Sequence, residues 1–228
     1  MINLIDFSDR ITQDYLRALK QKSLDHRLVR NPDFLEQIKR EISEDNILPV
    51  TINGSGQYHH LTYGICNQIQ FPFGYLHIDA HEDAQSRQEI WGGGFVEQIV
   101  NETRATAAIC WGIPIAYKFS WSYFHSKERE RGYTNLEAYE VDFLKVIDFL
   151  PDRVYVSVDL DVLKDFCSDY TCGIMSKEQL FLSLNLIAKR KKIIGGDICG
   201  YTGNHQECLE TVIETIWKIE QAVLKTSR

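Results

Sequence analysis

Short apolar runs alternate with longer amphipathic segments along most of the chain. Runs with the length and composition of strands cover residues 47–52, 75–78, 107–111, 115–119 and 154–158, and a further run passes through two glycines to end at 197–198. β-Branched and aromatic residues dominate the run at 154–158, which is typical of a buried strand. The pattern predicts a strand at each of these places.

Helical periodicity fills the intervals between the runs. It predicts helices from near Phe95, over residues 136–150, from Ser176 to about residue 191, and over about 206–224. The charged residues 127–132 are interpreted as a loop. Strands that alternate with helices, without an internal repeat or a linker, indicate a single α/β domain spanning residues 1–228, with a mainly parallel sheet flanked by helices.

Residues 1–46 are interpreted as an N-terminal helical extension packed on that domain. Asp9 precedes one amphipathic segment, and Asn31 and Pro32 begin a second, with apolar residues at helical spacing in both. The two predicted helices are expected either to cover the main domain or to form part of a partner-binding surface.

Candidate chemistry gathers where the predicted strands end. The run at 75–78 passes directly into Asp79, His81 and Asp83, which are spaced two residues apart. Side chains two apart in an extended chain point to the same side, so these three are expected to converge. Ligands of open parallel sheets bind at the carboxyl ends of the strands, which is where these residues lie.

A second acidic pair follows the strand at 154–158. Asp159 and Asp161 are again two residues apart, and like charges leaving a buried strand require a compensating cation. His59 or His60, after a glycine-containing loop, supplies an imidazole. Four aspartates with two histidines suit two divalent cations, and oxygen-rich ligation favours Mn²⁺, with Fe²⁺, Co²⁺ or Zn²⁺ as alternatives.

These motifs resemble those of the ureohydrolase superfamily, which includes arginase and agmatinase. The family pattern of Asp-Ala-His-x-Asp and Ser-x-Asp-x-Asp is similar to residues 79–83 and 157–161, and its Gly-Gly-Asp-His loop is similar to residues 56–59 in a degenerate form. The resemblance spans about residues 47–201 and implies a three-layer arginase/deacetylase-like fold.

The resemblance also implies the roles of single residues. Asp79 and Asp159 would bridge two Mn²⁺ ions, His59 and Asp83 would complete one site, and His81 and Asp161 would complete the other. Hydrolysis would occur at the planar guanidinium carbon, and Asp83 would relay a proton to the leaving amine. The products would be an amine and urea.

The sequence departs from the family in the substrate pocket. Gly200 stands where the family's late Asp-x-x-Glu places a glutamate that contacts the guanidinium, and the family's Asp-Pro after the second acidic pair is replaced by Lys164 and Asp165. Retained metal positions with a lost small-substrate pocket resemble the peptide arginases. This resemblance implies that arginine side chains in a ribosomally made precursor peptide are converted to ornithine, with that peptide as the partner.

Five further side chains are candidates to contact the substrate or move protons. The candidate substrate contacts are Gln85, Glu89, Trp91 and Asp197, and His60 is a candidate catalytic residue. Asp197 is the first choice to replace the missing glutamate and Glu89 the second. His77, within the strand before Asp79, is expected to be a core or supporting histidine.

Composition restricts partners and compartment. A formal net charge of −7 argues against a nucleic-acid partner and weakly favours a cationic substrate. No apolar run reaches the roughly 18 residues of a membrane span, and the charged N-terminus lacks the apolar core of a secretory signal. The sequence therefore predicts a cytoplasmic protein with reduced cysteines and no membrane partner, and it leaves a homo-oligomer open.

Two other functions stay open on the sequence alone. One is a small-molecule hydrolase of the same fold, acting on a guanidino, formimino or acetylated-amine compound. The other is a non-enzymatic binding protein that keeps metal for stability.

Overall fold

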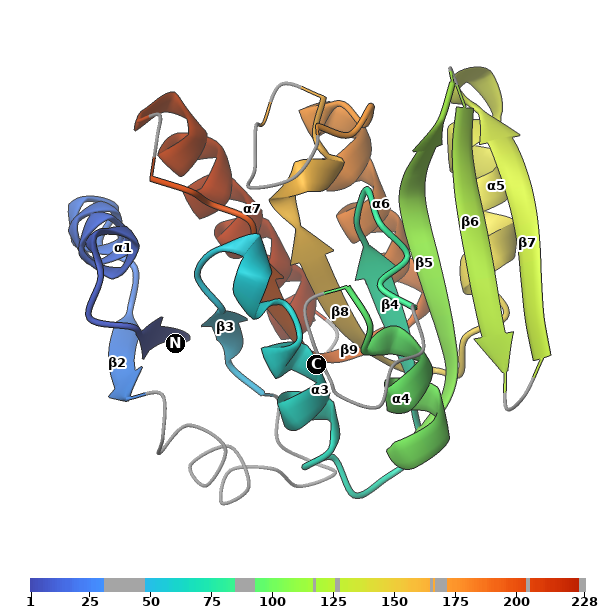
Figure 1. The fold of residues 1–228 in the computed structure, drawn as a ribbon, viewed down its shortest axis with the longest axis horizontal. Coiled ribbons are helices and arrows are strands. Elements are labelled where there is room, and N and C mark those ends of the chain that lie inside the picture. Colours follow the sequence, from blue (N-terminus) through green and yellow to red (C-terminus); the bar gives the residue numbers. More distant parts are fainter. Residues whose placement is uncertain are drawn as a thin grey trace.

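The computed structural model describes residues 1–30, 48–84, 93–116, 118–125, 128–164, 166, 172–203 and 206–225. Within this part of the chain, nine strands form one sheet in the order β2-β1-β3-β9-β8-β4-β5-β6-β7 (Figure 1). The strands are β1 (Ile2–Asp6), β2 (His26–Arg30), β3 (Val50–Ile52), β4 (Phe73–Ile78), β5 (Ala105–Ile115), β6 (Lys118–His125), β7 (Glu128–Asn135), β8 (Arg153–Asp159) and β9 (Lys192–Cys199).

The sheet is parallel from β2 to β5 and antiparallel beyond it. Every neighbouring pair from β2 to β5 runs parallel, whereas β6 and β7 extend the sheet as antiparallel strands. The predicted α/β class with a mainly parallel sheet is therefore confirmed. Parallel pairing brings the carboxyl ends of β3, β9, β8 and β4 to one edge.

Helices cover both faces of the sheet and make three layers. One face packs against α1 (Arg10–Gln21), α5 (Tyr139–Ile147), α6 (Lys177–Arg190) and α7 (Gln206–Lys225), and the other against α3 (Leu61–Cys66) and α4 (Val96–Glu102). The 3₁₀ helices of the described residues are η2 (Gly56–Tyr58), η3 (Leu136–Ala138) and η4 (Leu160–Val162).

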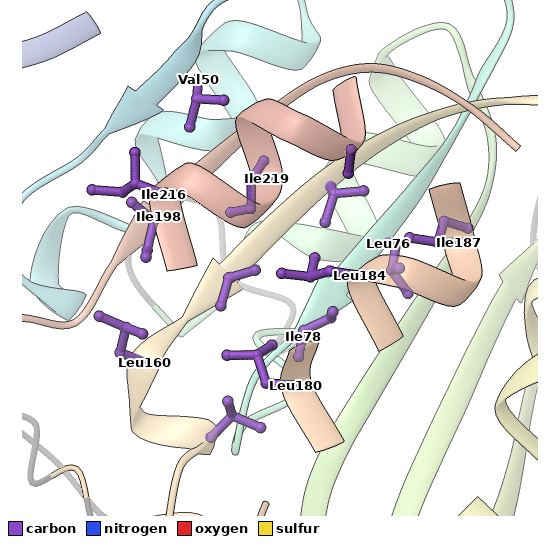
Figure 2. Packing of buried hydrophobic residues seen from close by; sticks show 14 of the residues in the cluster. Val50, Leu76, Ile78, Leu160, Leu180, Leu184, Ile187, Ile198, Ile216 and Ile219 are labelled. Carbon is purple, nitrogen blue, oxygen red and sulfur yellow. The ribbon is translucent and has the colours of Figure 1, made fainter. Parts of the chain in front are cut away.

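The larger core lies between the sheet and the helices of the first face. Figure 2 shows aliphatic side chains of β3, β4 and β9 meeting those of α6 and α7, including Val50, Leu76, Ile78, Ile198, Leu184 and Ile219. All of these side chains are buried, so close packing against the helices fixes the positions of the strands that carry the acidic motifs.

Several predicted elements are confirmed with small shifts in their ends. Ser176 caps α6 with a full capping box, in which its hydroxyl accepts from the Gln179 backbone and the Gln179 side chain accepts from the Ser176 backbone. Asp9 caps α1 by accepting a hydrogen bond from the Thr12 backbone. Phe95 directly precedes α4, as the periodicity predicts.

The interpretation of residues 1–46 as a helical extension is wrong. The segment contributes β1 and β2 to the sheet, and β1 pairs with both β2 and β3, so only α1 is helical among its described residues. The second predicted helix falls on residues 31–47, outside the described residues. Parallel strands need a crossover helix, and α1 supplies it between β1 and β2.

The interpretation of residues 127–132 as a loop is also wrong. Residues 128–135 form β7, whose side chains are mostly exposed. A strand that lies largely in solvent needs no apolar alternation, so its charged sequence does not predict a strand. No helix in the described residues is long and apolar enough to cross a membrane.

Candidate metal centre and pocket

The candidate ligands come from three separate stretches that meet at the carboxyl edge of the sheet. Asp79 directly follows β4, Asp159 ends β8, and Asp161 lies in η4 just beyond it. His59 follows η2 in the connection after β3. The structure thus brings together the six predicted metal positions His59, Asp79, His81, Asp83, Asp159 and Asp161.

His59 is oriented by a hydrogen-bond chain behind it. Its Nε2 lies 2.8 Å from the Ser157 hydroxyl, which in turn donates to Asp197 at 2.6 Å. Because the Ser157 proton is used on Asp197, the hydroxyl is left to accept from Nε2. In the neutral ring, this arrangement places the proton on Nε2 and leaves Nδ1, which faces the carboxylates of Asp79 and Asp83, free to bind a cation.

Asp79 lies between the side chains of His59 and His81. Its Oδ2 is 3.1 Å from Nδ1 of His59, and its Oδ1 is 3.4 Å from Nδ1 of His81. His81 also lies 2.9 Å from Oδ2 of Asp161. A carboxylate whose two oxygens face two different nitrogen ligands has the arrangement of a bridge between two cations.

Buried polar atoms without partners indicate that a cation fits this site. Within the described chain, Nδ1 of His59, Nε2 of His77 and Oδ2 of Asp79 are buried and make no hydrogen bond. Such atoms are costly unless something compensates them. Three of them within reach of further carboxylates match the donor set of a divalent cation, so these residues suit the group.

Asp159 is supported on its far side by a thiol and a backbone amide. The Cys199 thiol donates to its Oδ2 at 3.1 Å, and the Asp161 amide donates to its Oδ1 at 3.0 Å. Gly200 packs against the same carboxylate: a Cβ at this position would lie 2.3 Å from Oδ1 of Asp159. Position 200 therefore supports a ligand and has no room for a side chain.

A pocket of about 620 Å³ opens above these ligands. One wall carries Glu82, whose carboxylate accepts from the Ser122 hydroxyl and from the side chains of Arg129 and Arg131. Both arginines belong to β7, so the antiparallel hairpin forms one side of the entrance. Asp79, His81, Asp83, Asp159 and Asp161 all contribute to the lining.

Two predicted site residues lie elsewhere than expected. Asp197 is fully buried and bonded to Tyr155 and Ser157, so the expectation that it contacts the substrate is corrected: it holds His59 through Ser157. His60, predicted as catalytic, begins α3 and is not among the pocket-lining residues. Gln85, Glu89 and Trp91 fall outside the described residues.

Four residues that the structure places at the site were not predicted from the sequence. Ser157 entered only as part of the family motif at residues 157–161, and no role was predicted for Cys199. Arg129 and Arg131 were assigned to a loop. Their alternation two residues apart is the signal that would have placed both on one side of a strand.

The ionisable groups of the metal-free site hold protons that a cation would displace. Asp161, and after it Asp79, raise the pKa of His81 from its ordinary 6.5 to about 11. Burial, and then the charge of Asp79, raise the pKa of Asp159 to about 6. Burial followed by Asp159 raises the pKa of Asp161 as well.

These pKa values predict that metal stabilises the protein more at pH 8 than at pH 5.5. Both pKa values are raised by folding, so their contribution to metal-free stability is lost as pH rises, from about 4 to 6 for Asp159 and from about 6.5 to 11 for His81. Metal binding needs the deprotonated forms, and affinity should rise on the order of tenfold per pH unit for each proton released. Melting temperatures with and without Mn²⁺ at both pH values measure this; an equal rise at both would contradict it.

The fold and this site define a class: a metal-dependent hydrolase whose carboxylate-rich centre lies at the carboxyl edge of a parallel sheet. The model of the arginase family matches residues 4–208. The chain belongs to the arginase family.

Known proteins similar to this chain agree with that assignment. A hypothetical agmatinase from Burkholderia thailandensis has a TM-score of 0.68 at 12% identity, covering 99% of this chain and 84% of that one. Helicobacter pylori arginase has a TM-score of 0.65 at 14% identity, covering 97% and 98%. Formimidoylglutamase from Bacillus subtilis has a TM-score of 0.66 at 14% identity, covering 99% and 85%. At these identities the likeness concerns the fold.

A relative in sequence is an uncharacterized protein from Thermotoga maritima. It is 29% identical over 160 residues, which make up 68% of this chain and 61% of that protein. The alignment thus spans less than two thirds of the relative's length.

Proposed function

We propose that this chain hydrolyses the guanidino group of arginine side chains within a peptide, giving ornithine and urea. The observation that supports the hydrolytic part is the convergence of His59, Asp79 and His81 beneath an open pocket, where Nδ1 of His59 and Oδ2 of Asp79 are buried without a hydrogen bond among the described residues. Two divalent cations, with Mn²⁺ as first choice, would supply an activated water and stabilise charge on the attacked group.

Different residues of the chain would hold the two cations and transfer the proton during hydrolysis. His59, Asp79, Asp83 and Asp159 would hold one cation, while His81 and Asp161, with Asp79 and Asp159 again, would hold the other. Water adds to the guanidinium carbon, the bond from that carbon to the side-chain nitrogen breaks, and that nitrogen leaves as an amine after receiving a proton. Asp83 lines the pocket, and burial, followed by the charge of Asp79, raises its pKa. A carboxyl group with a raised pKa suits the transfer of that proton.

Two features support a peptide rather than a free amino acid. Position 200 offers no carboxylate to a guanidinium, because Gly200 packs on Asp159. Binding then relies on other parts of the substrate, and a peptide has more of these than a free amino acid. β7 pairs with β6 on one side only among the described residues, and its Arg129 and Arg131 line the pocket. An exposed strand edge with arginine donors beside the pocket offers hydrogen bonds to an extended peptide backbone.

The test compares one arginine in two forms. Urea release is measured from free L-arginine and from a short peptide with blocked ends that contains one arginine, with the metal sites filled. We expect kcat/KM for the peptide to be at least about tenfold higher, because contacts away from the reacting carbon position it for attack. A matched peptide with lysine in place of arginine is the blank. Faster turnover of free arginine would contradict the peptide proposal.

A small-molecule substrate is the second candidate. The pocket volume of about 620 Å³ lies within the roughly 300–1,000 Å³ of ordinary small-molecule sites. Agmatine and a formimino compound therefore belong in the same assay. Turnover of either one above that of the peptide would establish this alternative.

A further inference from the structure

His77 is the buried group at the metal centre that the proposed mechanism does not use. It lies in the middle of the sheet on β4, fully enclosed, with its ring stacked on His59 at 4.8 Å between centroids and edge-on to Phe95 at 5.6 Å. Its Nε2 is directed at the carboxylates and has no hydrogen bond within the described chain. A buried polar atom without a hydrogen bond is uncommon, and this one faces the carboxylates of Asp79 and Asp83.

The position of His77 closely parallels that of His59. Nε2 of His77 lies 3.1 Å from Oδ2 of Asp79 and 3.7 Å from Oδ2 of Asp83. Nδ1 of His59 lies 3.1 Å and 3.4 Å from the same two oxygens. In both cases the contact with Asp79 lacks hydrogen-bond geometry despite its short distance. Two nitrogens that approach one pair of oxygens in this way surround a common point.

The other ring nitrogen of His77 is held in a manner that suits a ligand. Nδ1 lies 2.9 Å from the Tyr75 hydroxyl, which is itself fully buried. Burial raises the pKa of Tyr75 well above its usual range, so the phenol stays neutral. When Nδ1 carries the ring proton and donates it to this oxygen, Nε2 presents a lone pair to the centre. Ligand histidines commonly have such a partner on their second nitrogen.

We infer that His77 is an additional ligand of the cation bound by His59, Asp79 and Asp83. One site then has two imidazoles, from His59 and His77, whereas the site of His81 and Asp161 has one. Imidazole suits Zn²⁺ and Fe²⁺, while oxygen-rich ligation suits Mn²⁺. The two-imidazole site therefore binds the first equivalent of Zn²⁺ and prefers it over Mn²⁺ more strongly than the other site does. The inference rests on the metal centre of the proposed function and is independent of its substrate.

X-ray absorption at the zinc edge tests this directly on the metal-free protein given one equivalent of Zn²⁺. Scattering from imidazole rings is expected to report two histidines per zinc in the wild-type chain and one in His77→Phe. Phenylalanine keeps the ring packing against His59 and Phe95. One histidine per zinc in the wild-type chain would overturn the inference, and that reading needs no variant to fold.

Metal affinity measured by chelator competition gives an independent readout. His77→Phe is expected to weaken the first Zn²⁺ by more than the roughly 10–100-fold that loss of an outer hydrogen-bond partner costs, and to weaken Mn²⁺ less. Tyr75→Phe, which removes only the partner of Nδ1, is expected to stay within that range and to keep two histidines per zinc. Equal losses for Zn²⁺ and Mn²⁺ in His77→Phe would contradict a ligand role.

Controls separate these results from folding and from substrate. His125→Ala removes an exposed histidine far along β6 and is expected to leave zinc affinity unchanged. Metal-free His77→Phe and Tyr75→Phe both lose the bond between these two side chains, and a cooperative melting transition in each shows that the variant is folded. No step of the test uses substrate, so failure of the peptide proposal would leave these outcomes unaffected.

Discussion

Replacing Asp79 with alanine is expected to empty both halves of the metal centre and to abolish hydrolysis. Its two oxygens face His59 on one side and His81 on the other, at 3.1 Å and 3.4 Å. Loss of a carboxylate that serves both cations removes a ligand from each and leaves Asp83, Asp159 and Asp161 to repel one another. We expect a fall in kcat/KM of at least about 1,000-fold, because both the activation of water and the stabilisation of charge are lost.

Elemental analysis after purification measures this result separately from activity. The wild-type chain is expected to hold two metals and Asp79→Ala fewer than one. The matched control is Asp9→Ala, which removes an aspartate that caps α1 far from the centre. That variant should lose about 1 kcal/mol of stability and keep its metals. An Asp79→Ala chain that still held two metals would show that Asp79 does not bridge.

Gly200→Glu is expected to destroy metal binding rather than to create an arginase with a small-molecule pocket. The backbone at Gly200 has φ +100, which side-chain-bearing residues rarely adopt, and an added Cβ would lie 2.3 Å from Oδ1 of Asp159. The substitution would supply the carboxylate that the family places here, but its first carbon displaces a ligand. We expect loss of both metals that Asp159 would help to hold, and no gain of turnover on free arginine or agmatine.

Two alanine variants separate the effect of backbone strain from the effect of the contact between position 200 and Asp159. Gly200→Ala introduces both the backbone strain and the contact with Asp159. Gly203→Ala introduces strain at φ +79, but its nearest neighbours are side-chain atoms of Ile11 and Asp14 at 3.5 Å and 3.8 Å. Both should lose about 1–3 kcal/mol from the strained backbone. Only Gly200→Ala should also lose metal; equal metal content in the two variants would refute the role assigned to position 200.

The strands with apolar sequence were predictable, and the charged ones were not. The run at 154–158 became β8 because buried parallel strands need apolar side chains on both faces. The sequence of β7 is charged and exposed, and only its pairing with β6 makes it a strand. Similarly, β2 is recognised by its pairing with β1 and not by its own composition.

Most of the candidate metal ligands could be predicted from the sequence, because their arrangement depends on local geometry. Asp79, His81 and Asp83 follow directly from the end of β4, so their spacing determines their relation before any long-range contact forms. The choice of His59 over His60 depended on the family resemblance. Of these two histidines, His59 is the one that reaches the carboxylates, and the hydrogen bonds from Asp197 through Ser157 orient its ring.

By itself, the sequence determined the class of fold and five candidate metal positions, with His59 or His60 as the sixth, since periodicity and short spacings are properties of neighbouring residues. The tertiary structure alone decided what surrounds them. Parallel pairing of β8 with β9 placed Asp197 behind His59, and pairing of β6 with β7 brought two arginines to the pocket. The tertiary structure also left Nε2 of His77 without a hydrogen bond among the described residues, because no donor or acceptor with suitable geometry packs against it.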